Sequence, residues 1–388
     1  MKKILTVLIV ILVLFNLSAV YSYADGSVYA AKNQNTLSVS ADKYAIMEIE
    51  SKTFLAGKGS YETFAASHFT KLMTLLLVCE KIDDKSVSFD DVVTVSEYAN
   101  LQQGSQVWLD KGEKIKISEL IKAVTIGNAN DACVALSETV DKKISDFVSR
   151  MNDKAKKLGM INTVYADCTG ESNDNITTVH DTAILASELL RHEYLKEYLT
   201  SWRDFIGEKQ SEVVNQNTLV KSYKGITGLK ACVSAQGVNM ISASAQRGDM
   251  SIVCIAVGCS SRDQRAVDAE NMLDFSFSQF QVYTPEVDET LLDDINVAHG
   301  DKESVKVSLS KPLKLVIKRG TSSELLVDAN REESVEAPKK KGDSVGRITV
   351  KNGDKTVFSS DIELSEDAEK ITVFGAFLKL IYSLTGGK

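Results

Sequence analysis

The chain places its predicted strands at the two ends of a helix-rich stretch, and this order constrains the fold more than any other feature. Residues 43–54 alternate apolar and polar side chains, which is typical of a strand, and a turn at residues 57–59 predicts a hairpin. Strand patterns dominate again at residues 225–233, 239–245 and 251–258. This order predicts one sheet assembled from both ends, with the intervening helices packed on it.

Helices are expected between these strands and directly after them, because apolar residues recur there at helical spacing. Asp131 is expected to cap the helix that starts at Ala132, and Gly159 to end the helix that starts at Ile144. The pair Gly248-Asp249 predicts a tight hairpin turn between the last two strands. The expected helices are residues 69–82, 117–124, 132–140, 144–158, 178–194, 195–202 and 268–280.

The sequence changes character after about residue 283, which indicates further domains. Short β-type runs alternate with polar turns, so a small all-β domain is expected at residues 284–365, after a first domain at residues 40–282. Residues 369–385 form an amphipathic pattern that is too short to span a bilayer but suits a helix lying in its surface. The alternative is that this helix packs on the β domain.

Residues 1–24 are predicted to be a secretory signal peptide. Lys2 and Lys3 precede an apolar run at residues 4–17, and small residues around Ala24 suit a cleavage site. An uncleaved membrane anchor is the alternative, but the apolar run is short for a membrane span. The protein is therefore expected to be exported, extracytoplasmic and membrane-associated at the cell envelope.

Composition disfavours several classes of partner. The formal net charge of −8 and the absence of a dense basic patch argue against nucleic-acid binding. The histidines are scattered and the cysteines have no framework or metal-ligand spacing, so neither a metal nor another cofactor is expected. Most of the cysteines are interpreted as small buried hydrophobic residues. They are Cys79, Cys133, Cys168, Cys232, Cys254 and Cys259.

The start of the helix at residues 69–82 carries a candidate site. His68 and Lys71 are three residues apart, a spacing that places two side chains on one face of a helix. Ser67 is four residues before Lys71, which is also a neighbouring spacing, but one position turns a side chain by roughly 100° around a helix. Ser67 is therefore interpreted as a helix cap.

Three segments, in order, resemble the motifs of D-alanyl-D-alanine carboxypeptidases, the low-molecular-weight penicillin-binding proteins. Residues 66–74 resemble the Ser-x-x-Lys helix, residues 125–132 the Ser-Gly-Asn-Asp-Ala loop, and residues 225–232 the Gly-Leu-Lys-Thr-Gly strand. The resemblance extends over roughly residues 40–280. It implies an α+β fold: a penicillin-binding/β-lactamase-like domain with an antiparallel sheet and helices, followed by the small all-β domain and the C-terminal amphipathic helix.

The resemblance also implies a reaction and its residues. In this family a serine attacks the D-Ala-D-Ala carbonyl of a peptidoglycan stem peptide, and the lysine of the same helix takes its proton. The loop serine and asparagine relay protons and bind the substrate amide, while the strand motif binds the terminal carboxylate. Lys71, Asn130 and Lys230 match the family motifs at catalytic or substrate-binding positions.

Four motif positions differ from the family pattern, and they are the chemically important ones. His68 replaces the nucleophile and Asn128 the loop serine, while Ala231 and Cys232 replace the threonine and glycine of the strand. Cys232 lies beside Lys230, which could lower the pKa of its thiol and make it reactive. A small residue tolerated on a strand is the simpler interpretation.

The leading hypothesis is an exported carboxypeptidase-like protein that has lost catalysis and binds a peptidoglycan stem peptide, a β-lactam-like ligand or a protein partner. Loss of such a nucleophile costs about 10⁶ in kcat, or roughly 8 kcal/mol. One alternative is an active carboxypeptidase with a displaced nucleophile such as Ser67. Another is a structural envelope protein with a vestigial pocket.

Overall fold

The computed structural model describes residues 36–384 of the 388-residue chain. The predicted signal peptide, residues 1–24, lies outside the described residues, and residues 385–388 do as well.

A central antiparallel sheet organises the first domain, as the sequence predicted. Its path runs β10-β11-β12-β1-β2, and β9 pairs with β11 beside this path. The early strand β1 lies between β2 and the late strand β12, so the two sequence ends of the domain meet in the middle of the sheet. The strands are β1 (Lys43–Glu48), β2 (Phe54–Lys58), β9 (Ile226–Gly228), β10 (Ala231–Val233), β11 (Asn239–Arg247) and β12 (Met250–Cys259).

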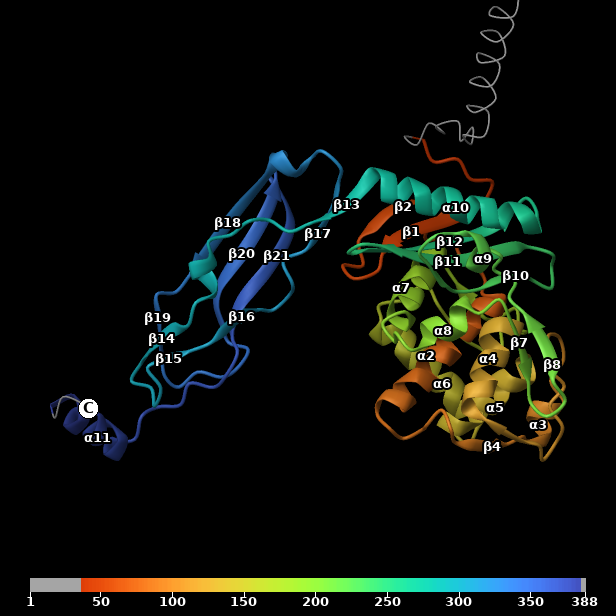
Figure 1. Cartoon of the computed structure of the whole chain (residues 1–388), viewed down its shortest axis with the longest axis horizontal. Coiled ribbons are helices and arrows are strands. Elements are labelled where there is room, and N and C mark those ends of the chain that lie inside the picture. The colour runs from red at the N-terminus through yellow and green to blue at the C-terminus, as the bar shows by residue number, and fades with distance from the viewer. Residues whose placement is uncertain (1–35, 385–388) are drawn as a thin grey trace, which may run out of the picture. The chain divides into compact units, whose positions relative to one another are not determined.

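Helices cover both faces of this sheet, and the alternation along β12 shows how. Val253 and Ile255 face a core that includes α2 (Thr70–Asp83) and α7 (Val179–Leu189). Cys254 and Ala256 face the opposite core, beneath α10 (Arg262–Gln279). Figure 1 shows α10 along one face and the remaining long helices gathered on the other. The strands are therefore apolar on both sides.

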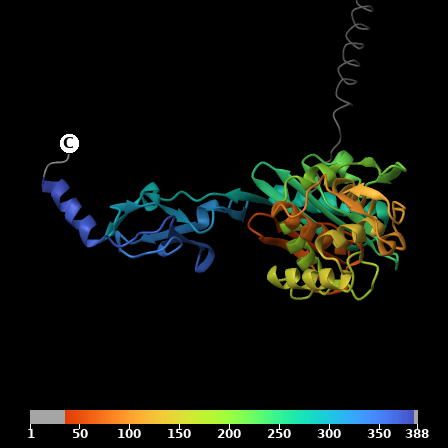
Figure 2. The ribbon, with the colours of Figure 1, turned by 90° about the horizontal axis from the view of Figure 1, so that it is seen from below.

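The helical layer is built around α2, which is buried from Thr70 to Cys79. Figure 2 shows the amphipathic helix α6 at the periphery of this layer, where it buries one stripe. The other helices of the layer are α3 (Glu97–Asn100), α4 (Ile117–Gly127), α5 (Asn130–Val140), α6 (Ile144–Lys157) and α8 (Leu195–Thr200). The short helix α9 (Leu219–Ser222) instead places Leu219 in the core beneath α10. Two-stranded ladders join β3 (Phe64–Ala65) to β6 (Ile176–Thr177), β4 (Val92–Thr94) to β5 (Lys114–Lys116), and β7 (Arg203–Ile206) to β8 (Ser211–Val214).

Two local predictions were wrong. The first hairpin turns at residues 49–52 and not at 57–59, because Lys52 adopts a left-handed backbone and Glu48 accepts a hydrogen bond from the Ser51 N–H. Asp131 does not cap a helix. It is the second residue of α5, whose N-cap is Ala129, and its carboxylate binds a neighbouring segment instead.

Other boundaries follow the predicted local signals. Gly159, with φ 76°, directly follows α6 and its C-cap Leu158, as expected. The turn at Gly248 joins β11 to β12. Helix α10 begins six residues earlier than expected, because the Ser261 side chain accepts a hydrogen bond from the Gln264 N–H and caps it.

The predicted all-β domain is present after β13 (Phe280–Tyr283). Its apolar core includes Ile295, Val335 and Ile348. A four-stranded sheet runs β16-β21-β20-β18, beside a three-stranded sheet β15-β14-β19 and the pair β13-β17. The strands are β14 (Ile295–Ala298), β15 (Ser304–Val305), β16 (Val307–Leu309), β17 (Leu315–Lys318), β18 (Leu325–Arg331), β19 (Ser334–Glu336), β20 (Ser344–Asn352) and β21 (Lys355–Leu364).

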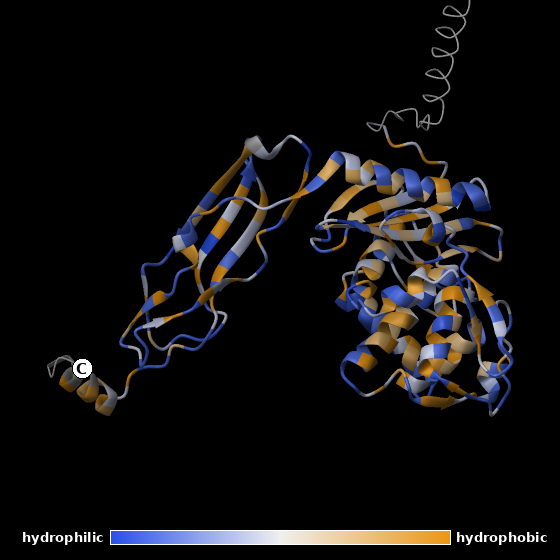
Figure 3. Cartoon of the chain, in the orientation of Figure 1, coloured by the Kyte–Doolittle hydropathy of each residue, from blue (hydrophilic) through white to orange (hydrophobic). Residues whose placement is uncertain are grey.

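The described chain ends in α11 (Val373–Leu384), close to the predicted terminal helix. Val373 is 91% exposed and Phe374 is 70% exposed, and further apolar side chains follow along the helix (Figure 3). Within residues 36–384, no helix combines the length and the apolar character needed to cross a membrane. The overall architecture confirms the predicted α+β class, with an all-β domain and a short terminal helix after the sheet-and-helix domain.

Candidate functional site

The first motif lies at a strained bend before α2. Ser67 to Phe69 form a 3-10 helix, η1 (Ser67–Phe69), that leads directly into α2. Ser67 has a left-handed backbone with φ 46°, a conformation that costs a residue with a side chain on the order of 1–3 kcal/mol. Neither η1 nor α2 has a side-chain cap, so the prediction that Ser67 caps a helix was wrong.

Gly170 allows another loop to approach this bend. A Cβ atom at Gly170 would lie 1.8 Å from the carbonyl oxygen of Ser67, and Gly170 itself has φ 88°. Only glycine fits such a close approach with that backbone. The backbone of the loop at Gly170 therefore packs directly against the backbone of the bend at Ser67.

His68 and Lys71 are in direct contact, as their spacing predicted. The Lys71 Nζ atom lies 3.1 Å from Nδ1 of His68 and donates a second hydrogen bond, of 2.6 Å, to the carbonyl oxygen of Thr169. With Lys71 as the donor, Nδ1 accepts and the proton of a neutral imidazole is on Nε2. The lysine that matches the family's proton acceptor is therefore bound to the imidazole that replaces the nucleophile.

Burial keeps the His68 imidazole neutral. Burial, with smaller contributions from the positive charges of Lys71 and Lys230, lowers the pKa of His68 to about 3. Burial also lowers the pKa of Lys71, whose side chain is completely enclosed. Both shifts favour the uncharged forms of these groups.

The second motif lies between α4 and α5. Asn128 ends α4 with a left-handed backbone, φ 58°, and its Nδ2 atom lies 3.5 Å from the carbonyl oxygen of Ala231. Asn130 begins α5 and is fully buried; its Nδ2 donates to the Gln103 carbonyl at 2.6 Å and to Oε1 of Glu171 at 2.7 Å. Both amide protons of Asn130 therefore already have partners within the chain.

The third motif spans β9, the start of β10 and the turn between them. The ammonium of Lys230 points into the protein, where it donates to the carbonyl oxygens of Val124 and Thr125 on α4. Burial lowers the pKa of Lys230 to about 7, with a smaller contribution in the same direction from Lys71. In this arrangement Lys230 joins the second and third motifs.

Burial and nearby positive charges act in opposite directions on the pKa of the Cys232 thiol. Burial raises the pKa of the Cys232 thiol to about 11, and this effect outweighs the opposing charges of Arg265, Lys230 and Lys71. A hydrogen bond from the backbone N–H of His68 to this thiol is a further, smaller opposing effect. Burial therefore favours the protonated thiol of Cys232, which lies next to the backbone of His68.

A loop at residues 167–175 contributes to the site, although the motif analysis missed it. The Asp167 carboxylate accepts hydrogen bonds from the backbone N–H groups of Thr169, Gly170 and Ser172 at 2.6–2.7 Å. The loop then supplies the Thr169 carbonyl to Lys71 and the Glu171 carboxylate to Asn130. An Asp followed three residues later by Gly is a turn signal that could have indicated the loop, but not its contacts.

Buried polar atoms without a partner concentrate at the motifs. Among the described residues there are four such side-chain atoms, and three of them belong to Thr70, Asn128 and Asn130. Native proteins satisfy nearly all buried polar groups, so a cluster of exceptions marks a site under functional constraint. The fourth atom, Oε1 of Glu48, lies on β1.

All predicted site residues meet in one place, although their chemical roles remain predictions. Cys232 contacts His68, Asn128 contacts Ala231, Lys230 binds α4, and the loop at residues 167–175 joins Lys71 to Asn130. Ser67 is next to the site, but the hydrogen bonds of Lys71 described above go to His68 and Thr169. The three motifs therefore lie together as one site, in which His68 stands where the family has its nucleophilic serine.

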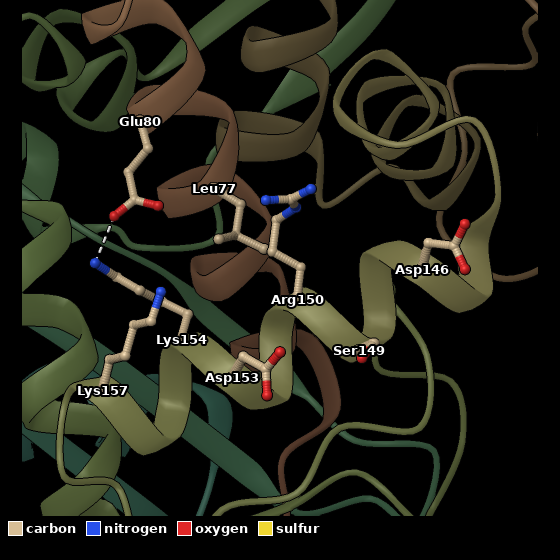
Figure 4. Close-up of a pocket in the computed structure, with 8 residues that line it drawn as sticks. All are labelled: Leu77, Glu80, Asp146, Ser149, Arg150, Asp153, Lys154 and Lys157. Carbon is tan, nitrogen blue, oxygen red and sulfur yellow. Dashed lines mark hydrogen bonds and ion pairs between the residues drawn. The ribbon is translucent and has the colours of Figure 1, made fainter.

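Other candidate sites are weaker. A surface pocket of about 260 Å³ lies between α2 and α6 (Figure 4), and no residue of the three motifs lines it. Several of its charges are paired within the chain, such as Lys154 with Glu80 and Arg150 with Asp141. Within residues 36–384, no group of three or more His, Cys, Asp or Glu side chains is placed to hold a metal ion.

All six cysteines are buried and free, in agreement with the interpretation of most of them as small hydrophobic residues. Cys133 lies on α5 behind Lys71, and its thiol donates to the carbonyl oxygen of Cys168 at 3.1 Å. These residues belong to the packing around the site.

Comparisons with known proteins cover almost the whole chain. The model of the D-alanyl-D-alanine carboxypeptidase family matches residues 29–261, and that of the penicillin-binding protein 5 C-terminal domain matches residues 277–370. The D-alanyl-D-alanine carboxypeptidase DacF of Bacillus subtilis is 30% identical over 385 residues, which cover 98% of this chain and 97% of DacF. DacC of Escherichia coli is 27% identical over 365 residues, covering 92% of this chain and 91% of DacC.

Solved structures agree with this fold. Penicillin-binding protein 5 from Haemophilus influenzae superposes with a TM-score of 0.74 at 22% identity, covering 86% of this chain and 98% of its own. Penicillin-binding protein D2 from Listeria monocytogenes, solved with cefotaxime bound, has a TM-score of 0.56 at 24% identity and covers 62% of this chain and 99% of its own. The chain therefore belongs to the D-alanyl-D-alanine carboxypeptidase family, the low-molecular-weight penicillin-binding proteins of peptidoglycan metabolism.

Proposed function

We propose that this chain is an exported, membrane-associated member of the family that binds peptidoglycan stem peptides without hydrolysing them. The observation that carries the proposal is the contact between His68 and Lys71. The imidazole stands at the nucleophile position with Nδ1 3.1 Å from the Lys71 Nζ atom. Lys71, which is expected to take a proton from a serine hydroxyl, is instead hydrogen-bonded to the imidazole of His68, which has no hydroxyl group.

The imidazole is a poor substitute for the serine. In the tautomer in which Nδ1 accepts from Lys71 and the proton is on Nε2, neither nitrogen of His68 has a free lone pair for attack on a carbonyl. Loss of a serine nucleophile costs about 10⁶ in kcat, which is roughly 8 kcal/mol of transition-state stabilisation. Nothing in the contacts of His68 replaces that stabilisation.

Cys232 adds a second obstacle to acyl transfer. Enzymes of this chemistry stabilise the developing oxyanion with backbone N–H donors at the nucleophile position. Here the N–H of His68 is hydrogen-bonded to the Cys232 thiol, a side chain that the family's glycine would lack. The substitutions at 68 and 232 therefore act against the same step of the reaction.

Retention of a binding role is supported by the unpaired buried atoms of Thr70, Asn128 and Asn130. A site relieved of every function could replace such groups with apolar residues at little cost, because unpaired buried polar atoms are destabilising. Their concentration at the motifs favours a bound peptide over the structural envelope protein with a vestigial pocket. A β-lactam-like ligand could occupy the same site without acylation.

The alternative of an active carboxypeptidase that uses Ser67 is less well supported. Ser67 is buried and has a left-handed backbone, and the hydrogen bonds of Lys71 go to His68 and Thr169. This alternative predicts that Ser67→Ala abolishes activity. The non-catalytic proposal predicts that Ser67→Ala changes nothing in a turnover assay.

The test measures D-alanine release and peptide binding on the same protein. The chain is incubated with a soluble stem peptide that ends in D-Ala-D-Ala, and its melting temperature is followed in parallel. We expect no release above background and a raised melting temperature, since a ligand at a hundred times its Kd adds about 2.7 kcal/mol. Release at the rate of an ordinary relative would contradict the proposal, and an unchanged melting temperature would favour the structural alternative.

Export and membrane association form the second part of the proposal. The apolar run at residues 4–17 supports export, and the exposed side chains of Val373, Phe374 and Phe377 on α11 support contact with a membrane surface. A fractionation experiment on the producing cells tests this part. Recovery of the chain in the cytoplasmic fraction would contradict it.

A further inference from the structure

Trp108 is held in an unusual position on the loop between α3 and β5. Its side chain is 67% exposed, whereas Val107 and Leu109 on either side are 3% and 2% exposed. Its backbone is left-handed, with φ 57°, a conformation that bulky residues rarely adopt. The chain therefore turns outward for this one residue and presents an indole to solvent.

The contacts around Trp108 show that this position is fixed. The N–H groups of Val107 and Leu109 both donate to Oδ2 of Asp131, at 3.1 Å each. The carbonyl oxygen of Trp108 accepts a 2.6 Å hydrogen bond from the Nζ atom of Lys209, next to the turn between β7 and β8. Residues held in strained conformations by such surrounding contacts are concentrated at binding sites.

The same contacts place Trp108 beside the second motif. Asp131, which holds the two flanking N–H groups, directly follows Asn130. The Asn130 N–H donates to the Ser105 carbonyl at 2.6 Å, and the Asn130 side chain donates to the Gln103 carbonyl. The segment that presents Trp108 is thus bound to the motif that is expected to contact the peptide.

The chemistry around Trp108 suits a sugar ring better than a protein surface. Nearby exposed side chains form ion pairs, Lys209 with Asp110 at 2.7 Å and Lys111 with Glu97 at 2.8 Å. The cores of protein interfaces are depleted in charged residues. A pyranose ring instead offers a C–H face that can pack on the flat indole, and hydroxyl and amide groups that can reach charged neighbours.

We infer that Trp108 is a stacking platform for an amino-sugar ring of the peptidoglycan glycan strand, beside the site that takes the stem peptide. The inference rests on the proposed function, because the glycan and the peptide are parts of one polymer. It assigns a glycan contact to the loop at residues 101–110, outside the three motifs.

The test uses the two tryptophans of the chain separately. In a Trp202→Phe background, Trp108 is the only indole, and its fluorescence is followed during titration with a tetramer of β-1,4-linked N-acetylglucosamine. A sugar-free stem peptide that ends in D-Ala-D-Ala is titrated in parallel. Calorimetric titration with the same tetramer, which needs no indole, compares the affinities of the wild type, of Trp108→Ala and of Tyr98→Ala, which removes another exposed aromatic ring from α3.

We expect the sugar tetramer to change the fluorescence of Trp108 and Trp108→Ala to weaken its binding at least about tenfold, equivalent to 1.4 kcal/mol. Tyr98→Ala should retain binding. Trp108→Gly, which suits the left-handed backbone, provides a second variant if Trp108→Ala folds poorly. Sugar binding of equal strength in the wild type and both Trp108 variants, or no sugar binding at all, would overturn the inference.

The peptide titration separates this inference from the proposed function. Peptide binding without sugar binding would overturn the role of Trp108 alone. Hydrolysis of the peptide would contradict the proposed function, while a Trp108-dependent sugar signal in the same experiment would still support the platform.

Discussion

At the scale of single residues, His68 makes the stability of the protein sensitive to acid. Its pKa is about 3 in the folded chain and 6.5 when unperturbed, so between these values the unfolded chain binds the extra proton. Stability should therefore fall as the pH decreases from 6.5 towards 3, by at most about 1.4 kcal/mol per pH unit from this group.

Urea unfolding of the wild type and of His68→Ser between pH 4 and 8 measures this contribution. The variant should show a shallower loss of stability in acid, since the carboxylates that titrate in this range are common to both proteins. His299→Gln is the matched control, because His299 is exposed and lies in the β domain. Equal slopes for the wild type and His68→Ser would contradict the assigned environment of His68.

Cys232 provides a second prediction at the residue scale. Its buried thiol, with a pKa raised to about 11, should resist alkylation by iodoacetamide at pH 8 in the folded protein. Mass mapping should find Cys232 unmodified under native conditions and fully modified in urea, where all six cysteines are accessible. Rapid native labelling of Cys232 would instead support a thiol nucleophile.

At the scale of elements, the loop at residues 167–175 joins two of the three residues that match the family motifs, Lys71 and Asn130. Although burial opposes it, hydrogen bonds from the backbone N–H groups of Gly170, Ser172 and Thr169 lower the pKa of Asp167. Asp167→Ala should therefore destabilise the protein by about 2–4 kcal/mol, because several backbone donors lose a charged acceptor.

Thermal or urea unfolding checks this expectation, with Asp174→Ala as the control for removal of an exposed carboxylate from the same loop. A loss below about 0.5 kcal/mol for Asp167→Ala would show that the loop does not depend on its carboxylate. The expected loss should also diminish in acid, as protonation of Asp167 removes the same interaction from the wild type.

The elements also show how far the sequence could predict the structure. The sheet assembled from both ends, the helix at α2 and the hairpin β11–β12 follow from periodicity and turn residues, which are local signals. The first turn was missed because the alternating pattern of residues 43–54 hides a local turn, in which Lys52 is left-handed and the Ser51 N–H donates to Glu48. The role of Asp131 was missed because it depends on hydrogen bonds from a segment distant in sequence. The motif residues could be named from the sequence, but the contact of Cys232 with the His68 N–H depends on tertiary packing.

At the scale of the whole molecule, α11 is expected to hold the protein on a membrane. Exposed apolar side chains, including Val373, Phe374, Phe377 and Leu378, lie on this helix. Residues 25–388 should sediment with anionic phospholipid vesicles, and residues 25–368 should remain in the supernatant. The double variant Phe374→Asp with Phe377→Asp should also remain in the supernatant, because it places charges on the apolar side chains of α11. Vesicle binding by the truncated chain would contradict the role of α11.

The central claim is that the family site persists but cannot be acylated. Labelling with a fluorescent penicillin tests it most directly, on the wild type, His68→Ser, and His68→Ser with Cys232→Gly. We expect no covalent band on the wild type, and a band on the double variant at least as strong as on His68→Ser, because the glycine frees the backbone N–H at position 68. A covalent band on the wild type that disappears in Ser67→Ala would contradict the account and identify a displaced nucleophile.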